Sequence, residues 1–266
     1  MCKILYFSGN KNQIKLAFDF VDALVDASSN DPTYPKGATQ HKDGFGYAIV
    51  GLTENKPNIH FFKSIKPIFK AGEEISQLKE VIKGLDYFSL SLHSRKVLEG
   101  SANIFNTHPY FFSSVKGFSF FLSHNGTLDK SKLQSLLEVN NMDNLSDTFL
   151  LGLIIEKNLN AIDSESVIPL FKEFTQYIES ALNTITLFSD AQTDKTKVLL
   201  TNYYKKTPDY YKVYILRAPG LFAFTSSGVY HYIQERGIAQ MEPLKNKSAF
   251  FIEDAFLQDT REVSLE

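Results

Sequence analysis

The spacing of apolar and polar residues along this chain predicts a mixture of helices and strands. Apolar positions three or four residues apart predict helices over residues 14–25, capped by Asn12, and over 76–85 and 164–187, with two more opened by Asp129 and Asp147. Residues 28–40 contain Asn, Asp, Pro and Gly and predict a loop. Short β-branched and aromatic runs predict strands at residues 3–7, 45–52, 59–65, 87–93, 118–124, 198–204, 211–216, 221–225, 229–232 and 249–252.

The order of these elements indicates the fold class. Helices cluster in the middle of the chain between two groups of strands, a pattern typical of a layered α+β protein. The sequence shows no Pro-, Gly- or Ser-rich linker and no repeat, so we expect one domain over residues 1–266. The 23 Phe and 13 Tyr residues, without any Trp, indicate a large core and not a cofactor cage.

Charge and composition exclude several classes of function. The net charge is −2 and the two signs are interleaved, so the sequence carries no footprint for nucleic acid or an anionic membrane. No apolar run is long enough to span a bilayer or to act as a signal peptide, and we expect a cytoplasmic protein. No phosphate-binding loop or dinucleotide fingerprint is present, and we expect no cofactor.

The only cysteine of the chain is Cys2. A lone cysteine excludes an intramolecular disulfide and a multi-cysteine metal site, and we expect no metal. Removal of Met1 would leave a thiol and a free α-amine on one residue. The ordinary pKa of an α-amine is about 7.7–8.0 and that of a thiol about 8.5, so the amine can accept the thiol proton near neutral pH.

Polar clusters stand at the ends of predicted strands and at the starts of predicted helices. Taken singly, each has a structural explanation: Asp-Gly and Asn-Gly form turns, and Ser-Asp starts helices. The five clusters are His41-Lys42-Asp43-Gly44-Phe45-Gly46, His93-Ser94-Arg95, Asn106-Thr107-His108-Pro109, His124-Asn125-Gly126-Thr127 and Ser146-Asp147.

Together with Cys2, and in this order, these clusters resemble the class II glutamine amidotransferases, most of all the stand-alone members. Those proteins begin with Met-Cys and have His-Lys-Asp-Gly-Trp-Gly, Asn-Thr-His-Pro and His-Asn-Gly segments. The specific matches run from Cys2 to Asp147. The resemblance implies the N-terminal nucleophile hydrolase fold, a four-layer αββα sandwich of two antiparallel sheets.

The resemblance also implies roles in acyl transfer. Cys2 would attack the amide carbonyl, and its α-amine would serve first as general base and then as general acid. The side-chain amide of Asn125 and the backbone N–H of Gly126 would form the oxyanion hole.

For substrate binding, the resemblance implies four residues. The guanidinium of Arg95 has the fork geometry that suits an α-carboxylate, and Asp147 would hold the α-ammonium. Thr107 and His108 would form the pocket wall at the amino-acid end of the substrate.

Four further positions bear on this resemblance. Asp43 and Gly44 would form a turn beneath the nucleophile, with a structural role. The usual Trp of this segment is Phe45, which loses an N–H donor. The Glu that the family places two residues after its Asp is Phe149, which predicts weaker glutamine binding or a different substrate.

The sequence therefore predicts a hydrolase that cleaves a γ-glutamyl amide through a Cys2 thioester. Its substrate is either free glutamine, with ammonia passed to a separate synthase partner, or a larger γ-glutamyl compound. One alternative is a non-catalytic binding subunit with the same fold, suggested by Phe149. Another is a papain-like enzyme with His93 or His108 as base, although Cys2 has no flanking helix to lower its pKa.

Overall fold

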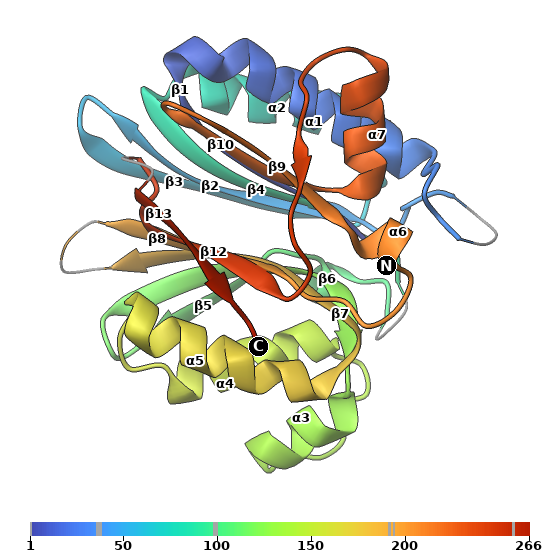
Figure 1. Ribbon diagram of the computed structural model, residues 1–266, viewed down its shortest axis with the longest axis vertical. Coiled ribbons are helices and arrows are strands. Elements are labelled where there is room, and N and C mark those ends of the chain that lie inside the picture. Colours follow the sequence, from blue (N-terminus) through green and yellow to red (C-terminus); the bar gives the residue numbers. More distant parts are fainter. Residues whose placement is uncertain (1, 36–38, 98–100, 191–192, 194, 257–258) are drawn as a thin grey trace.

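Two antiparallel sheets lie face to face in the computed structural model, and helices cover the outer face of each (Figure 1). The structure describes residues 2–266 except 36–38, 98–100, 191–192, 194 and 257–258. The helices are α1 (Ile14–Ser29), α2 (Gly72–Lys83), α3 (Lys130–Leu137), α4 (Asp147–Asn158), α5 (Ser164–Phe174), α6 (Pro208–Tyr211) and α7 (Ser227–Glu235).

The first sheet has seven strands in the order β11-β9-β10-β1-β4-β2-β3. The second has six in the order β13-β12-β8-β7-β6-β5. The strands are β1 (Lys3–Asn10), β2 (Phe45–Thr53), β3 (Lys56–Ser64), β4 (Tyr87–Ser94), β5 (Tyr110–Ser114), β6 (Phe118–Leu128), β7 (Ile178–Asp190), β8 (Thr196–Asn202), β9 (Val213–Ala218), β10 (Leu221–Ser226), β11 (Glu242–Pro243), β12 (Ser248–Asp254) and β13 (Asp259–Ser264).

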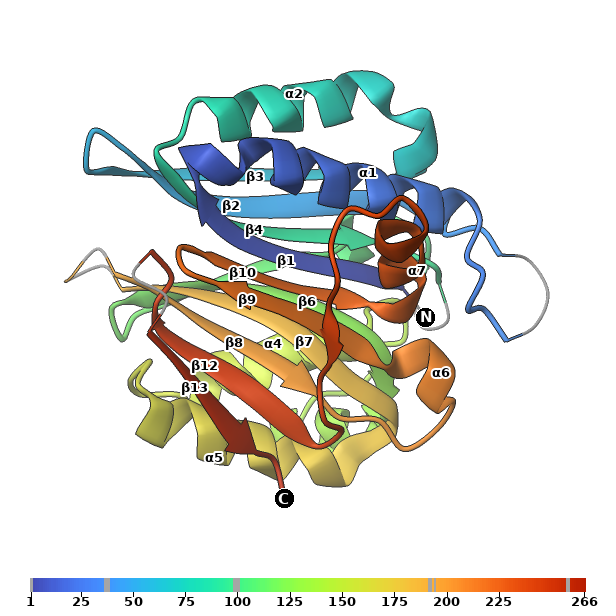
Figure 2. The ribbon, with the colours of Figure 1, turned by 45° about the horizontal axis from the view of Figure 1, so that its top comes forward.

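Three apolar cores hold the four layers together. One lies between the first sheet and helices α1, α2 and α7, and a second lies between the other sheet and helices α3, α4 and α5. The third fills the space between the sheets, where Ile4 and Tyr6 of β1 pack with Leu187 of β7 and Phe250 of β12. Figure 2 shows the resulting order of helices, sheet, sheet and helices, as predicted.

Strand β1 occupies the middle of its sheet, between β10 and β4. All but the last of its residues are buried. Cys2 directly precedes this strand, so the sheet fixes the position of the sole thiol. In the second sheet, β6 runs between β5 and β7 and ends close to the start of β1.

The helix predicted over residues 164–187 is wrong in its second half. Helix α5 ends at Phe174, and the chain continues after a short 3-10 turn as strand β7. The central part of β7 is buried on both faces, so its apolar residues do not alternate and also fall at helical spacing. Its Ile and Thr residues favour the strand.

Two other predictions near helix ends are corrected by the structure. Residues 229–232, predicted as a strand, belong to helix α7, where Val229 and Ile233 are buried one turn apart against the first sheet. Asn12, predicted to cap α1, lies inside a 3-10 turn (Lys11–Gln13) that leads into the helix, and this turn is capped by Asn10, whose side chain accepts a hydrogen bond from the Asn12 backbone N–H. The short strands β5, β11 and β13 were not predicted at all.

Candidate active site

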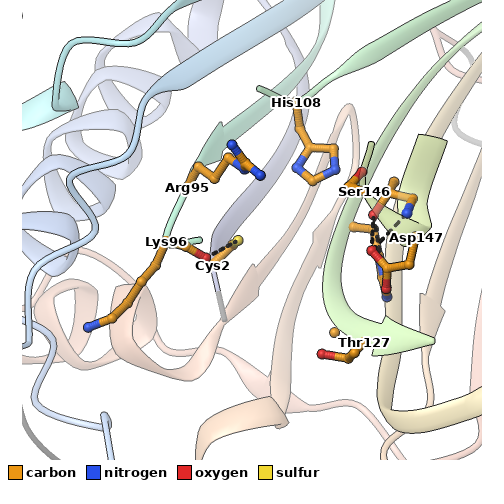
Figure 3. Close-up of a pocket in the computed structure, with 10 residues that line it drawn as sticks. Cys2, Arg95, Lys96, His108, Thr127, Ser146 and Asp147 are labelled. Atoms are coloured by element: carbon orange, nitrogen blue, oxygen red, sulfur yellow. Dashed lines mark hydrogen bonds between the residues drawn. The ribbon is translucent and has the colours of Figure 1, made fainter. Parts of the chain in front are cut away.

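Two side chains hold the backbone of Cys2 by hydrogen bonds. Its backbone nitrogen donates to Asn125 Oδ1 over 2.8 Å, and its carbonyl oxygen accepts from the Tyr210 hydroxyl over 3.1 Å. The thiol points to the Lys96 carbonyl oxygen at 3.8 Å (Figure 3). Residues distant in sequence therefore fix the sulfur in one place.

The environment of Cys2 favours the thiolate. Burial by itself raises the pKa of the thiol, because it disfavours the charged form. The positive charge of the amino terminus and the charge and hydrogen bonding of His93 outweigh this effect and lower the pKa to about 5. A thiol with such a pKa is mostly ionised at neutral pH and is a ready nucleophile.

Asn125 and Gly126 stand where β6 departs from regular pairing with β7. A register shift lies between Gly126 and Leu128, so the ladder opens beside the thiol. The Asn125 amide nitrogen is buried and has no hydrogen-bond partner among the described residues. A Cβ at Gly126 would stand 1.9 Å from the Ala181 carbonyl oxygen, so only glycine fits.

A pocket of about 30 Å³ lies over the thiol, enough room for one or two water molecules. It brings together five of the predicted residues: Cys2, Arg95, His108, Gly126 and Asp147. Five lining residues were not predicted as site residues: Lys96, His124, Thr127, Ser146 and Thr148. Each of these five is adjacent in sequence to a predicted site residue, so the motifs located the site but not its full lining.

Charged groups of opposite sign line this pocket. Arg95, directly after β4, is buried, and its Nη1 donates to the Ser101 carbonyl oxygen over 2.9 Å. Asp147, in the first turn of α4, lies apart from Arg95 across the pocket (Figure 3). Burial, together with the charge of Arg95, lowers the pKa of the neighbouring Lys63 to about 8. The Arg95 end of the pocket is therefore electropositive.

The carboxylate of Asp147 is oriented by backbone donors. Its Oδ2 accepts from the Leu128 N–H over 2.7 Å, and its Oδ1 accepts from the Thr148 N–H over 2.8 Å. Ser146 caps the same helix by accepting from the Phe149 N–H. Oδ1 also accepts from the Thr148 hydroxyl over 3.3 Å, so Oδ2, with one donor among the described residues, is the oxygen that can still accept from an ammonium group.

The two residues of the Thr107-His108 pair lie in different places. His108, which precedes a cis proline, lines the pocket, and burial holds its pKa well below the usual range. Thr107 does not line the pocket: its hydroxyl donates to the Asn103 carbonyl oxygen over 3.0 Å, and it packs near Gly44. Asn106 of the same motif joins this loop to α4, since its Oδ1 accepts from the Ser146 N–H.

The Asp43-Gly44 turn brackets Arg95 and has only structural contacts. The Asp43 N–H donates to the Arg95 carbonyl oxygen, and the Arg95 N–H donates to the Gly44 carbonyl oxygen. The Asp43 carboxylate accepts from the Val97 N–H over 2.8 Å. Gly44 has φ +107°, where a Cβ would stand 2.6 Å from the Ser64 carbonyl oxygen.

A buried ionic cluster behind the nucleophile was not predicted. Lys3 Nζ lies 2.7 Å from Asp31 Oδ2, and His41 Nε2 lies 3.0 Å from the same oxygen, with all three side chains fully buried. Lys3 Nζ also stands 4.2 Å from the ring centre of Tyr210. The cluster ties the loop after α1 to the first residue of β1, next to Cys2.

The two residues that depart from the amidotransferase pattern, Phe45 and Phe149, both pack among apolar side chains and do not line the pocket. Phe45 is fully buried in the core under α1 and α2, with Phe62 at 5.7 Å between ring centres. Phe149 packs against Tyr110 at 5.5 Å and Phe112 at 5.7 Å, and it does not line the pocket.

Comparisons with known proteins bear on the fold. No protein-family model matches this sequence, and no curated protein matches it. The structure is similar to a glutamine phosphoribosylpyrophosphate amidotransferase from B. subtilis, with a TM-score of 0.63 and 15% identity over the whole chain. It is equally similar to a structure described as the allosteric regulatory enzyme of purine biosynthesis, with a TM-score of 0.63 and 16% identity.

This chain spans 49% of each of those two chains, about half their length. The identities are low, so the likeness concerns the fold. It confirms the predicted resemblance at that level and the predicted layer order: the chain has the N-terminal nucleophile hydrolase fold of the class II glutamine amidotransferases.

Proposed function

We propose that this protein is an enzyme that cleaves a γ-glutamyl amide through a thioester on Cys2. The observation that carries the proposal is the grouping of a buried, activated thiol that lines the pocket, its own backbone nitrogen, and Asn125, which accepts from that nitrogen and keeps its amide N–H unpartnered among the described residues just behind the pocket lining. This grouping supplies a nucleophile, an amine and an oxyanion donor in one place.

The reaction begins once Met1 is removed and the Cys2 nitrogen becomes a free α-amine. The sulfur attacks the side-chain carbonyl of the substrate as a thiolate, the form that its low pKa favours. The protonated amine gives its proton to the leaving nitrogen as general acid, and ammonia departs from a thioester. Water hydrolyses the thioester, with the now neutral amine as general base, and releases glutamate.

The oxyanion formed in each step would be held by two donors. The Asn125 Oδ1 atom is occupied by the Cys2 nitrogen, so its amide nitrogen is oriented away and remains available. Gly126 lines the pocket and lies at the register shift of β6, where its backbone can approach a substrate closely. Donors fixed in advance at a dry site stabilise an oxyanion strongly.

Arg95 and Asp147 would hold the two charged groups of the amino-acid end, and His108, which lines the same pocket, would form part of its wall. The substrate carboxylate would replace the Ser101 carbonyl oxygen on the Arg95 guanidinium. Thr107, behind the Asp43-Gly44 turn, would support the pocket wall without touching the substrate.

The ammonia released by this reaction has two possible fates. We propose that it passes to a synthase partner. The other version is simple hydrolysis of a larger γ-glutamyl compound. Among the described residues no helix is long and apolar enough to cross a bilayer, and we propose a cytoplasmic location.

The non-catalytic alternative rests on the carboxylate that Phe149 replaces; Phe149 packs against Tyr110 and does not line the pocket, whose lining keeps the carboxylate of Asp147. The test is ammonia and glutamate release from glutamine and from γ-glutamyl amides, measured with the wild type and with Cys2→Ala. The proposal expects turnover only with the wild type. Equal turnover by Cys2→Ala, or none by either protein with any such amide, would contradict it.

A further inference from the structure

Three buried histidines lie together beside the nucleophile, and the mechanism above uses only one of them, to bind substrate. His93 comes from β4, His124 from β6 and His108 from the segment between β4 and β5. His93 Nε2 lies 3.0 Å from His108 Nδ1 and 3.3 Å from the His124 carbonyl oxygen, and the rings of His93 and His108 stand edge to face with centres 4.3 Å apart.

These contacts determine which ring nitrogens carry protons. A carbonyl oxygen only accepts, so His93 must carry a proton on Nε2 to donate to His124. The same N–H is shared with His108 Nδ1, which therefore accepts. A neutral His93 is then bare on Nδ1, and a neutral His108 carries its proton on Nε2.

His93 lies on the same face of the first sheet as Cys2. It pairs with Ile4 in the β1–β4 ladder, and Cys2, which directly precedes β1, is two residues before Ile4. The Nδ1 atom is buried and has no fixed hydrogen-bond partner among the described residues, because the thiol points instead to the Lys96 carbonyl oxygen. Even so, His93 hydrogen bonding and charge contribute to the low pKa of the thiol.

We propose that His93 is a catalytic residue: its Nδ1 takes the proton from Cys2 Sγ, so that the enzyme meets its substrate as a thiolate paired with an imidazolium. This proposal rests on the proposed function. It leaves the Cys2 α-amine to transfer the proton of the departing ammonia and not that of the thiol. Catalytic contacts are often loose before substrate binds, and a rotation of the thiol away from Lys96 brings Sγ to His93.

The proton and electron pairs balance over the cycle. The thiolate attacks the amide carbon, and the protonated α-amine gives its proton to the departing ammonia as the thioester forms. The neutral amine then takes a proton from water, and the hydroxide adds to the thioester. Collapse expels the thiolate, which is again paired with the imidazolium of His93. The net reaction is amide plus water giving acid plus ammonia.

The charges around His93 are consistent with this pairing. The positive groups near the three histidines are Arg95 and Lys63, and the negative group is Asp147, which acts on His124. A thiolate is the nearest anion that can balance an imidazolium at His93. The Nε2 atom of His108, buried without a partner among the described residues, is at the same time left as an N–H donor to the substrate.

The test is the pH dependence of Cys2 alkylation by iodoacetamide, which needs no substrate. Since Cys2 is the only cysteine, the reaction reports this thiol alone. The variant His93→Gln is suitable because the Gln amide nitrogen replaces Nε2 toward His124, while nothing replaces Nδ1. The proposal expects the midpoint of alkylation to rise by about 1–3 pH units. The pH midpoint is measured, and not the rate at one pH, because a thiolate of higher pKa reacts faster once it has formed.

The matched control is His231→Gln, at a half-exposed histidine of α7 distant from the site, which should leave the midpoint unchanged. An unchanged midpoint in folded His93→Gln would overturn the proposal. If that variant does not fold, the nitrogen NMR signals of the His93 ring at pH 7 decide: an imidazolium in the wild type that is lost in Cys2→Ser supports the proposal, and a neutral ring in the wild type would overturn it. Failure to hydrolyse glutamine would contradict the proposed function without changing either result.

Discussion

The backbone nitrogen of Cys2 donates to Asn125 Oδ1 over 2.8 Å, and this contact leaves the amide nitrogen of Asn125 buried without a partner among the described residues. One side chain thus orients the backbone nitrogen of the nucleophile and keeps an amide donor beside it. Cys2 directly precedes β1 and Asn125 lies on β6, in different sheets, so the packing of the sheets sets the geometry.

Replacing Asn125 with Ala should lower kcat by about 10²–10³ and change KM little, because a donor to an oxyanion acts mainly in the transition state. Asn125→Asp should lower kcat further, since it places a carboxylate where negative charge develops. Steady-state kinetics with glutamine check both variants. A drop in kcat/KM that comes from KM alone would assign Asn125 to substrate binding.

Replacing Arg95 with Lys keeps the positive charge but loses the planar fork. We expect kcat/KM to fall by about 2–4 kcal/mol in transition-state terms, the range for disrupting a buried charged pair. Iodoacetamide should still alkylate Cys2 at the wild-type rate, because the small reagent needs no carboxylate clamp. Unchanged glutamine kinetics would show that the α-carboxylate is bound elsewhere.

The layered α+β architecture could be predicted from the sequence because most strands are short, bounded by turn residues and rich in aromatic or β-branched residues. The prediction failed at residues 178–187, where burial of both faces of β7 removes the alternation that distinguishes strand from helix. It failed at Val229 because four residues of α7 resemble a strand when read without their neighbours. In both cases tertiary burial decided the local structure.

The loss of the buried Lys3–Asp31 pair should destabilise the protein. Asp31→Ala leaves the Lys3 ammonium buried without its counter-charge, which typically costs about 3–5 kcal/mol of unfolding free energy. Urea denaturation measures this difference. Lys79→Ala, which removes a partly exposed pair with Asp22, is the matched control and should cost about 1 kcal/mol or less.

Stability should also fall as the pH drops from about 6.5 toward 4. Burial lowers the pKa of His41 from its ordinary value of 6.5 to about 4, so between these values the unfolded chain binds a proton that the folded protein does not. Lower pH therefore favours unfolding in this window. The variant His41→Gln should show a flatter dependence of the urea midpoint on pH, and an equally steep one would remove His41 as the cause.

Much of the site was accessible from the sequence because its residues follow one another in recognisable clusters. Cys2, Arg95, His108, Gly126 and Asp147 were predicted and line one pocket. The contact of the thiol with the Lys96 carbonyl oxygen could not be predicted, because every residue type carries this backbone group and the side chain gives no signal for it. The buried Lys3, Asp31 and His41 cluster was also missed, because only the folded chain brings these residues together.

A blocked amino terminus should abolish turnover if the Cys2 amine acts in proton transfer. A cleavable extension before Cys2 allows one sample to be assayed before and after proteolysis exposes the cysteine. We expect ammonia release from glutamine only after cleavage, with unchanged circular dichroism. Full turnover by the extended protein would leave His93 as the only base and remove the amine from the mechanism.

The most direct test of the central claim is the mass of the protein after reaction with diazo-oxo-norleucine, a glutamine-like electrophile. The account predicts one adduct per chain, located by peptide mass on a peptide that begins with Cys2, together with loss of glutamine hydrolysis. Excess glutamine should slow the labelling, and Arg95→Lys should weaken it. An adduct on another residue, or full hydrolysis by protein labelled at Cys2, would contradict the assignment of Cys2 as the nucleophile.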